Sequence, residues 1–330
     1  MKKIVILGSN SFAGTTFVEF LLKKNYKVFS TSRSNEKKKP FNIFRTFVKN
    51  KNYHFKKIDI NNKFDLDKLE NLILKNKIKF VVDFSSQSMV GQSWEKPEDW
   101  IRTNCLGKLN LIRKLNKIKD IKYIRISTPE VYGEIKKKIK ENDKIYPSTP
   151  YAITQSTADF FTYAYTKFMG FNSMTLRFAN FYGPGQQLYR IIPKTIMCIL
   201  NQEKLNLEGG GKSKRSFIFS DDFCKAIILS IKKGKKNETY NFSPNSEIRI
   251  IDLVYQICSL MNYSPKKLIN FSKDRIGKDF RYYMKSSKVR KKLGWRDNIK
   301  LKKGLQKTIE WYTKNFEDLK KLKKIYIHKR

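Results

Sequence analysis

The sequence predicts an α/β protein with a doubly wound parallel sheet and a smaller C-terminal domain. Short apolar runs alternate with helical patterns over the first half of the 330 residues, and such alternation is typical of βαβ units. The first run, residues 4–7, leads through a glycine turn at 8–14 directly into a helical pattern. A strand, a tight glycine turn and a helix N-terminus together cradle a dinucleotide pyrophosphate in the Rossmann fold.

The expected strands of this sheet are short runs rich in apolar and β-branched residues. The run 80–84 is almost wholly apolar, which suits a central strand buried on both faces. A lysine-rich loop marked by Pro40 is expected at 34–52. The predicted strands cover residues 4–7, 26–31, 55–60, 80–84, 122–127 and 173–178, and further helices are predicted at 64–75, 97–117 and 151–169.

The second half of the chain has a looser pattern, with shorter elements and a closing amphipathic helix at 301–316. We expect a dinucleotide-binding domain over residues 1–178, which segments near 217–242 rejoin. Residues 179–330 are expected to form a second, partly interleaved domain. It should bind the substrate over the carboxyl ends of the strands, because ligands bind there in open α/β sheets.

The chain is strongly basic, with 70 Lys and Arg against 29 Asp and Glu and a formal net charge of +41. The lysines are scattered through every segment, so we interpret the charge as a solvated surface and do not expect a nucleic-acid partner. A genuine polyanion-binding surface is the alternative interpretation. In either case a basic exterior attracts small phosphorylated molecules.

Composition also argues against several other classes of protein. No stretch approaches the ~20 apolar residues of a membrane span, so no membrane partner is expected. His54 and His328 are the two histidines, which argues against a histidine-based metal site or triad. The cysteines lack Cys-x-x-Cys spacing and are interpreted as free thiols in a reducing cytoplasm. They are Cys105, Cys198, Cys224 and Cys258.

Candidate chemistry is concentrated in two segments. One is Ile-Ser-Thr-Pro-Glu-Val-Tyr-Gly at 126–133, after a predicted strand, and the other is Tyr-Ala-Ile-Thr-Gln at 151–155, which opens a helix. With the glycine turn they resemble the extended short-chain dehydrogenase/reductase superfamily, in its NAD-dependent epimerase/dehydratase branch. The resemblance implies an NAD or NADP cofactor and a nucleoside diphosphate sugar substrate, held by the C-terminal domain. Further segments that resemble family motifs follow in the same order along the chain, at 85–88, 103–104, 177–184, 209–217 and 274–282.

Within that branch, residues 126–133 are similar to nucleotide-sugar 4,6-dehydratases of the dTDP-glucose and GDP-mannose types. The resemblance implies that Tyr151 takes the proton of the sugar C4 hydroxyl while the nicotinamide accepts the C4 hydride. Thr128 would hydrogen-bond the C4 oxygen, and Glu130 would remove the C5 proton before water leaves C6. Because side chains alternate along an extended segment, Thr128 and Glu130 are expected to point the same way.

Two positions depart from the family pattern. Pro129 stands where the dTDP-glucose type carries an aspartate that protonates the departing hydroxyl, although the GDP-mannose type also lacks that aspartate. Gln155 stands where the family motif Tyr-x-x-x-Lys has a lysine, whose charge lowers the tyrosine pKa and which binds the nicotinamide ribose. Gln155 can still hydrogen-bond the ribose, but it carries no charge. The next lysine of the helix, Lys167, is three turns away.

Gln155 therefore has two interpretations. In a retuned active site, replacing Gln155 with lysine should raise activity near neutral pH, because a positive charge would stabilise the Tyr151 phenolate. Otherwise, the protein binds a nucleotide sugar or cofactor without catalysis. Two neighbouring activities of the same branch are also open: a 4-epimerase, which needs no Glu130, and a decarboxylase of a sugar-nucleotide uronate.

The resemblance also assigns the remaining site residues. Arg33 follows Thr31 and Ser32 at the end of the second strand, where an NAD-binding domain carries an acidic residue, so the sequence favours NADP over NAD. Cofactor contacts are expected from Gly8, Ser11, Phe12, Gly14, Arg33, Asp59, Ile60, Ser85, Ser86 and Thr103. Substrate contacts are expected from Gln87, Asn180, Arg190, Arg215, Asn245 and Arg275, and catalytic roles from Thr128, Glu130, Tyr151 and Gln155.

A homodimer is expected as well. The helices predicted at 97–117 and 151–169 correspond to a pair that commonly packs across a two-fold axis in this superfamily, and both carry enough apolar residues to bury more than one face. These residues are Trp100, Ile101, Leu106, Leu109 and Ile112 on the first helix, and Phe160, Phe161, Tyr163 and Phe168 on the second.

Overall fold

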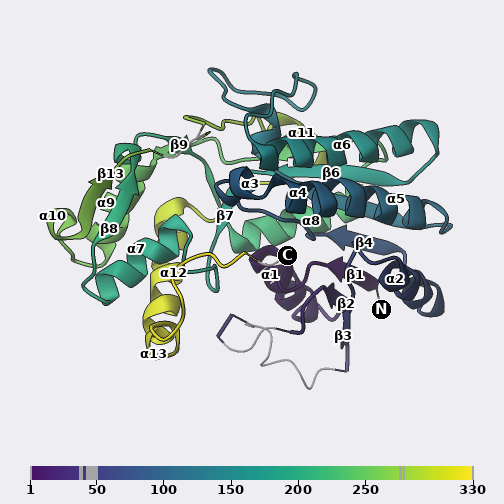
Figure 1. Ribbon diagram of the computed structural model, residues 1–330, viewed down its shortest axis with the longest axis horizontal. Helices are drawn as coiled ribbons and strands as arrows, with labels where there is room; N and C mark the ends of the chain where they lie inside the picture. Colours follow the sequence, from purple (N-terminus) through teal and green to yellow (C-terminus); the bar gives the residue numbers. More distant parts are fainter. Residues whose placement is uncertain (1, 37–39, 42–50, 275–276, 278, 329–330) are drawn as a thin grey trace.

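A parallel sheet forms the centre of the protein (Figure 1). The computed structural model describes residues 2–36, 40–41, 51–274, 277 and 279–328. Within them the largest sheet has the strand order β11-β6-β5-β4-β1-β2-β3, and every neighbouring pair is parallel. The predicted doubly wound fold is therefore confirmed. The strands are β1 (Lys3–Leu7), β2 (Lys27–Ser32), β3 (Tyr53–Lys57), β4 (Phe80–Asp83), β5 (Lys122–Ser127), β6 (Ser173–Phe178) and β11 (Thr239–Phe242).

The third strand differs from its predicted position. It ends at Lys57 rather than at residue 60 because Asp59 closes a turn: its carboxylate accepts a hydrogen bond from the Asn61 N–H at 3.0 Å. The other five strands predicted in the first half begin and end within one residue of their expected bounds. Most of the loop predicted at 34–52 lies outside the described residues.

Helices cover both faces of the sheet because side chains alternate along each strand. Ile4 and Ile6 of β1 enter a core that is shared with α1 and α8. Val5 and Leu7 of the same strand enter the opposite core, which is shared with α2 and α5. The turn that follows β1 therefore rests on a strand that is held from both sides. The helix bounds are α1 (Phe12–Leu22), α2 (Lys63–Lys75), α5 (Lys108–Asn116) and α8 (Ser220–Lys233).

The helix predicted at 97–117 is not continuous. It consists of α4 (Pro97–Trp100), a wider π-helix η2 (Ile101–Gly107) and α5. In the π-helix, the Asn104 side chain accepts a hydrogen bond from the Gln87 N–H and donates to the Gln87 carbonyl and to Thr154. π-helical turns are frequent at functional sites. This one ties the segment after β4 to helix α6 (Pro150–Phe168).

The second domain packs around its own apolar core. The chain enters it after β6, and β7 then pairs in parallel with β10. From β10 the chain returns through α8 to β11 at the edge of the large sheet, where the sequence indicates returning segments. The remaining elements of this domain include β7 (Asn180–Tyr182), α7 (Ile191–Leu200), β8 (Leu205–Glu208), β10 (Phe217–Phe219), α9 (Ile250–Leu260), β13 (Ile269–Ser272) and α12 (Leu301–Lys314).

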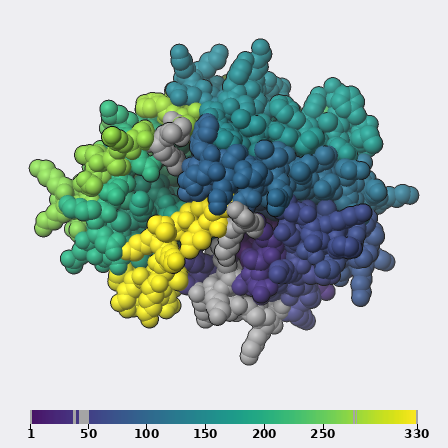
Figure 2. Space-filling view, in the orientation of Figure 1, coloured from purple at the N-terminus to yellow at the C-terminus, as the bar shows by residue number. Residues whose placement is uncertain are grey.

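The C-terminal segment crosses from the second domain to the first. It leaves α13 (Phe316–Leu319) and runs toward α4, as the yellow chain in Figure 2 shows. The His328 ring stacks on Trp100 with centroids 5.0 Å apart, and its Nε2 lies 2.7 Å from an Asp99 carboxylate oxygen. On the way, Tyr326 packs edge-on against Tyr189. The segment therefore connects the two domains, and a cavity lies between the domains beside it.

The turn after β1 depends on two glycines. Gly8 has φ +72°, in the left-handed region that favours glycine, and a Cβ there would lie 2.7 Å from the Phe84 carbonyl carbon. A Cβ on Gly14 would lie 2.5 Å from the Gly8 carbonyl oxygen, so α1 packs directly on the turn. Ser11 stands where the fingerprint usually has its middle glycine; it has φ −71°, and its Oγ accepts the Gly14 N–H. It caps the helix, as serine does well.

Gly14→Ala should destabilise the protein by about 1–3 kcal/mol, although alanine is the better helix former by about 1 kcal/mol. The reason is the contact between the added methyl group and the Gly8 carbonyl. Gly91→Ala is the matched control, because a Cβ there meets nothing within 4 Å and φ is −59°. Denaturant unfolding compares the variants, and equal stability would show that α1 does not rest on the turn.

Candidate active site

A cavity of about 610 Å³ lies between the two domains, at the carboxyl ends of the strands. This is the edge at which open α/β sheets bind ligands. Its wall contains residues from the glycine turn, from the segments after β4, β5 and β6, and from the second domain. Of the residues expected from the sequence, the cavity is lined by Ser11, Phe12, Ser86, Gln87, Thr128, Glu130, Tyr151, Gln155, Asn180, Arg190 and Arg215.

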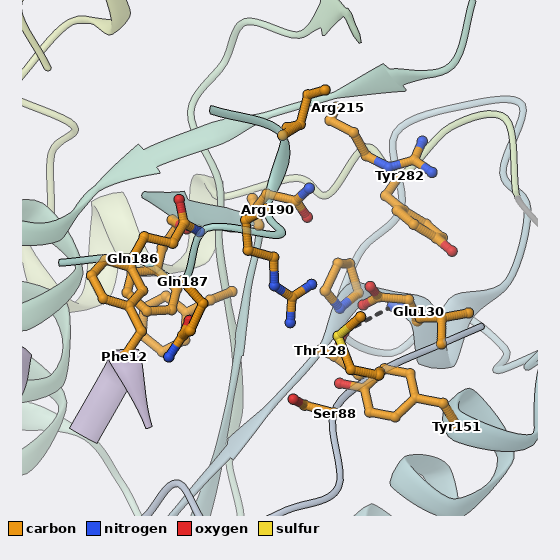
Figure 3. Close-up of a pocket in the computed structure, with 18 of the residues that line it drawn as sticks. Phe12, Ser88, Thr128, Glu130, Tyr151, Gln186, Gln187, Arg190, Arg215 and Tyr282 are labelled. Carbon is orange, nitrogen blue, oxygen red and sulfur yellow. Dashed lines mark hydrogen bonds between the residues drawn. The ribbon is translucent and has the colours of Figure 1, made fainter. Parts of the chain in front are cut away.

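The three residues expected to act on the sugar lie together. Thr128 and Glu130 belong to the short helical turn after β5, where the Thr128 Oγ1 accepts the Glu130 N–H at 3.4 Å. Tyr151 lies in the first turn of α6, which Thr149 caps by accepting the Ala152 N–H. Figure 3 shows the three side chains on one side of the cavity, with Arg190 pointing toward them from the other.

Burial controls the electrostatics of this group. Desolvation raises the pKa of Tyr151, and the nearby Glu130 carboxylate raises it further; hydrogen bonding to Thr128 and the charges of Arg190 and Arg125 act in the opposite direction. Burial also raises the pKa of Glu130, against the charges of Arg215 and Arg190. Among the described residues, no group hydrogen-bonds Oε2 of Glu130. A desolvated carboxylate of this kind is a stronger base than an exposed one.

Gln155 lies one helical turn after Tyr151 and is almost fully buried. Its side-chain Nε2 donates to Ser86 Oγ at 2.7 Å, and its Oε1 accepts from Arg125 at 2.7 Å. No role was predicted for Arg125 from the sequence. The available signal was an arginine in the middle of the apolar strand 122–127, because a buried charge needs a partner.

The expected cofactor residues divide into two groups. Ser11, Phe12 and Ser86 line the cavity, and Gly8 and Gly14 form the turn behind it. A turn that leaves no room for a Cβ, at the N-terminus of a capped helix, fits a dinucleotide pyrophosphate. When bound, the nicotinamide dinucleotide supplies a hydride acceptor and donor.

The second group of expected cofactor residues does not line the cavity. The Ser85 hydroxyl donates to Asp83 at 2.5 Å and accepts from Lys108 at 2.9 Å, so it belongs to a buried polar network. Thr103 accepts from the Asn61 side chain. The other members are Asp59, which holds the turn after β3, Ile60, which is buried in the core, and Arg33, which follows β2.

The expected substrate residues are also divided. Arg215 is held in place on the cavity wall: its guanidinium donates to the backbone carbonyls of Asp279 and Phe280 and lies 4.3 Å from the Tyr282 ring centroid. Asn245 is exposed and does not line the cavity. Arg275 lies outside the described residues.

Sequence reasoning missed several residues of the cavity wall. Tyr282 donates to the Asp279 carboxylate at 2.6 Å, and Ser148 donates to the same oxygen at 2.7 Å. Tyr326 of the C-terminal segment also lines the wall. These residues come from distant parts of the chain, so no local spacing could have brought them together. The family match at 274–282, which contains Asp279 and Tyr282, was the available signal for these two residues.

Comparison with known proteins agrees with this geometry. The family model described as GDP-mannose 4,6 dehydratase matches residues 5–308. The human dTDP-D-glucose 4,6-dehydratase is 29% identical over 98% of this chain and 93% of its own length. The structure of dTDP-glucose 4,6-dehydratase from Bacillus anthracis in complex with NAD is 29% identical, with a TM-score of 0.89 over 98% of this chain and 100% of that chain. The UDP-glucose 4-epimerase from Thermotoga maritima, solved with UDP-glucose, is 25% identical, with a TM-score of 0.86 over 95% and 99% of the two chains.

The fold, the cavity and these similarities define an NAD-dependent enzyme of the nucleotide-sugar dehydratase and epimerase branch of the extended short-chain dehydrogenase/reductase superfamily. Within that branch, the chain belongs to the GDP-mannose 4,6-dehydratase family, and the similarities support nucleotide-sugar 4,6-dehydratase function. The resemblance stated from the motifs is thereby confirmed. The preference for NADP drawn from Arg33 finds no support, because the solved relative from B. anthracis holds NAD.

Glu130→Gln should stabilise the protein near neutral pH by roughly 1–2 kcal/mol. Burial raises the folded-state pKa of Glu130, so the folded protein pays a penalty for ionising it as the pH rises above the ordinary value of 4.5. The stability gain of the variant should therefore vanish below about pH 4.5. Glu134→Gln, at an exposed position four residues on, is the control. Unfolding across this pH range measures both, and a gain that is independent of pH would contradict the assignment.

Proposed function

We propose that Thr128, Glu130 and Tyr151 carry out the 4,6-dehydration of a nucleoside diphosphate hexose. The observation that carries the proposal is their juxtaposition on one side of a cavity that also contains the glycine-turn residues Ser11 and Phe12. Tyr151 takes the proton of the C4 hydroxyl, and Thr128 hydrogen-bonds the C4 oxygen. Glu130 removes the C5 proton, which becomes acidic once C4 is a ketone.

Glu130 also has the means to complete the elimination alone. Pro129 has no proton to give to the departing C6 hydroxyl, so the proton must come from another group. The raised pKa of the buried Glu130 favours its protonated form after it has taken the C5 proton. We propose that Glu130 passes this proton to the C6 hydroxyl, which leaves as water. One carboxyl group then serves as base and acid in turn.

For the substrate we propose a nucleoside diphosphate hexose whose phosphates lie near Arg190 and Arg215. Both guanidinium groups belong to the cavity wall, and a planar guanidinium pairs well with phosphate oxygens. Because the human and B. anthracis relatives are named for dTDP-glucose, we propose this sugar nucleotide as the first substrate to test. For the cofactor we propose NAD, on the same similarity to the B. anthracis enzyme.

The direct experiment incubates the protein with dTDP-glucose, UDP-glucose, GDP-mannose or UDP-glucuronate, in the presence of NAD or NADP. Mass spectrometry of the products should show the loss of one water from one of these sugars. In D₂O the product should gain one deuterium, at C5. An unchanged mass with an altered sugar would instead indicate a 4-epimerase. Loss of carbon dioxide from UDP-glucuronate would indicate a decarboxylase. Tight NAD binding without any product would indicate a non-catalytic protein.

Glu130→Gln and Tyr151→Phe should affect different steps. Tyr151→Phe should lower both the reduction of bound NAD by the sugar and the loss of water by about 10²–10⁴-fold. Glu130→Gln should lower the loss of water by a similar factor but retain NAD reduction, because its amide cannot take the C5 proton. Absorbance of reduced nicotinamide and product mass measure the two steps separately. If Glu130→Gln loses both steps together, Glu130 does not act as proposed.

We also propose that the protein is a homodimer. The two segments expected to pair, η2 with α5 and α6, lie against each other and leave apolar side chains exposed. Of the apolar residues expected to bury more than one face of these segments, Trp100 and Ile112 are buried within the protomer, Trp100 beneath the His328 ring and Ile112 in the core beside the sheet. The exposed side chains are Ile101, Leu106, Ile153, Phe160, Tyr163 and Phe168.

Phe160→Glu should convert the dimer to a monomer. The Phe160 side chain is 57% exposed on α6, and a buried, unpaired carboxylate at an apolar interface is costly. Phe271→Glu is the control, because Phe271 is similarly exposed but lies on β13 of the second domain. Light scattering at micromolar concentration measures the mass. A monomeric wild-type protein, or an unchanged mass for Phe160→Glu, would contradict the proposed interface.

We also propose a cytoplasmic location for the protein. Cys105, Cys198, Cys224 and Cys258 are all free thiols, as suits a reducing compartment. In the part of the chain that the structure describes, no helix has the length and apolar content needed to span a bilayer.

A further inference from the structure

Arg125 lies in β5, the strand that leads to Thr128, and it is 1% exposed. Its Nε donates to the Asp159 carboxylate at 2.7 Å. Its Nη2 donates to the backbone carbonyl of Gln155 at 3.0 Å and to the side-chain Oε1 of Gln155 at 2.7 Å. Arg125 thus binds the residue that occupies the position of the family lysine.

This contact fixes the orientation of the Gln155 amide. A guanidinium group only donates hydrogen bonds, so the Gln155 atom that faces Arg125 must be the carbonyl oxygen. The NH₂ group is therefore turned the other way, toward Ser86 Oγ on the cavity wall. A cation bound to the oxygen of an amide also polarises its N–H bonds, which makes the NH₂ group a stronger donor. Gln155 presents to the cavity what a lysine would present: hydrogen-bond donors.

The charge balance beneath Gln155 is positive. Arg177 on β6 donates to the Asp159 carboxylate through Nε and Nη2, so Arg125 and Arg177 share one anion. The neighbouring buried pair of Lys108 and Asp83 is balanced. The buried network of these five residues therefore holds three cations and two anions. Each buried ion carries a desolvation penalty of several kcal/mol, and one cation of this network is not offset by an anion within it.

We propose that Arg125 is a positioning residue that replaces the missing lysine: it orients the Gln155 amide toward the cofactor and supplies the positive charge behind Tyr151. The two roles that one lysine combines are divided here between the neutral donor Gln155 and the buried cation Arg125. The proposal rests on the proposed function only in assigning Tyr151 as the residue that needs this charge.

The groups around Tyr151 agree with this division. Burial and the Glu130 carboxylate raise the pKa of Tyr151, and the effects that oppose them are hydrogen bonding to Thr128 and the charges of Arg190 and Arg125. Arg190 approaches from the second domain and also lies near Glu130. Arg125 approaches from the sheet and is held in place by Asp159 and Gln155.

The same geometry reverses the sequence expectation for Gln155→Lys. A lysine at this position would direct an ammonium group at the Arg125 guanidinium and would remove the side-chain acceptor that Arg125 uses, leaving the backbone carbonyl. Like charges in a buried site repel, so the single substitution should impair the enzyme at every pH. The substitution should succeed only when Arg125 is neutralised at the same time, because the charge is then relocated rather than doubled.

The test compares four full-length proteins: wild type, Arg125→Gln, Gln155→Lys and the double variant. Ser86→Ala is the control that removes the partner of the Gln155 NH₂ group without altering charge. Three properties are measured: the pH titration of the Tyr151 phenol in the NAD-bound protein, the affinity for NAD, and the pH profile of turnover with dTDP-glucose. The titration uses ultraviolet difference absorbance against the same protein carrying Tyr151→Phe.

Arg125→Gln should raise the Tyr151 pKa, because the Arg125 charge is one of those that lower it, and should therefore lower the phenolate fraction near neutral pH. It should also weaken NAD binding, because the Gln155 amide loses its fixed orientation. Ser86→Ala should weaken NAD binding and leave the Tyr151 pKa unchanged. The double variant should recover a Tyr151 pKa close to that of wild type and should exceed both single variants in turnover at neutral pH.

Unchanged phenol titration and NAD affinity in Arg125→Gln would overturn the proposal, as would a double variant no better than its worse parent. If Arg125→Gln does not fold, Arg125→Lys replaces it: this variant keeps the charge, so its Tyr151 pKa should stay near that of wild type while NAD affinity falls. A large pKa shift in Arg125→Lys would also overturn the proposal. The titration and NAD affinity remain decisive even if no sugar nucleotide is turned over, so failure of the proposed function is recognised separately.

Discussion

The carboxylate of Asp159 holds the active-site helix to the sheet. It accepts hydrogen bonds from Arg125 on β5 and from Arg177 on β6, and all three side chains are buried. Removing one partner of such a buried pair costs about 3–5 kcal/mol, so this contact fixes the rotation of α6 about its axis. The rotation in turn decides which face of α6, with Tyr151 and Gln155, lines the cavity.

The burial that suits Glu130 and Tyr151 for catalysis also lowers the stability of the fold. Glu130 is buried with an oxygen that no described group hydrogen-bonds, and its pKa is raised by desolvation. Tyr151 is buried beside it, and the Glu130 carboxylate makes ionisation of Tyr151 harder. Such an arrangement destabilises the fold but creates a carboxylate that binds a proton strongly. The charges of Arg215 and Arg190 act to lower the pKa of Glu130, and those of Arg190 and Arg125 act to lower the pKa of Tyr151.

Local pattern was enough to predict the parallel sheet. The strands 122–127 and 173–178 were predicted with their observed bounds. Short apolar runs that alternate with helical patterns are typical of parallel strands joined by helices. Thr128, Glu130 and Tyr151, which the motifs singled out, all line the cavity. The sequence did not predict contacts that the tertiary fold decides: Asn104 hydrogen-bonds Gln87 within a π-helix, and the Ser85 hydroxyl is held by Asp83 and Lys108. Sequence spacing contains no information about such partners. The role of Arg125 was missed for the same reason, since Gln155 and Asp159 are thirty or more positions away.

A chain without the family lysine should still perform the complete dehydration at one site. A sugar nucleotide that carries deuterium at C4 tests this claim most directly, with dTDP-glucose as the probe. In a 4,6-dehydratase the hydride taken from C4 is returned to C6 of the same molecule. We predict a 4-keto-6-deoxy product that retains the deuterium at C6, formed in a single turnover by the wild-type protein with bound NAD. Deuterium that remains at C4, or a product that lacks the label, would contradict the account.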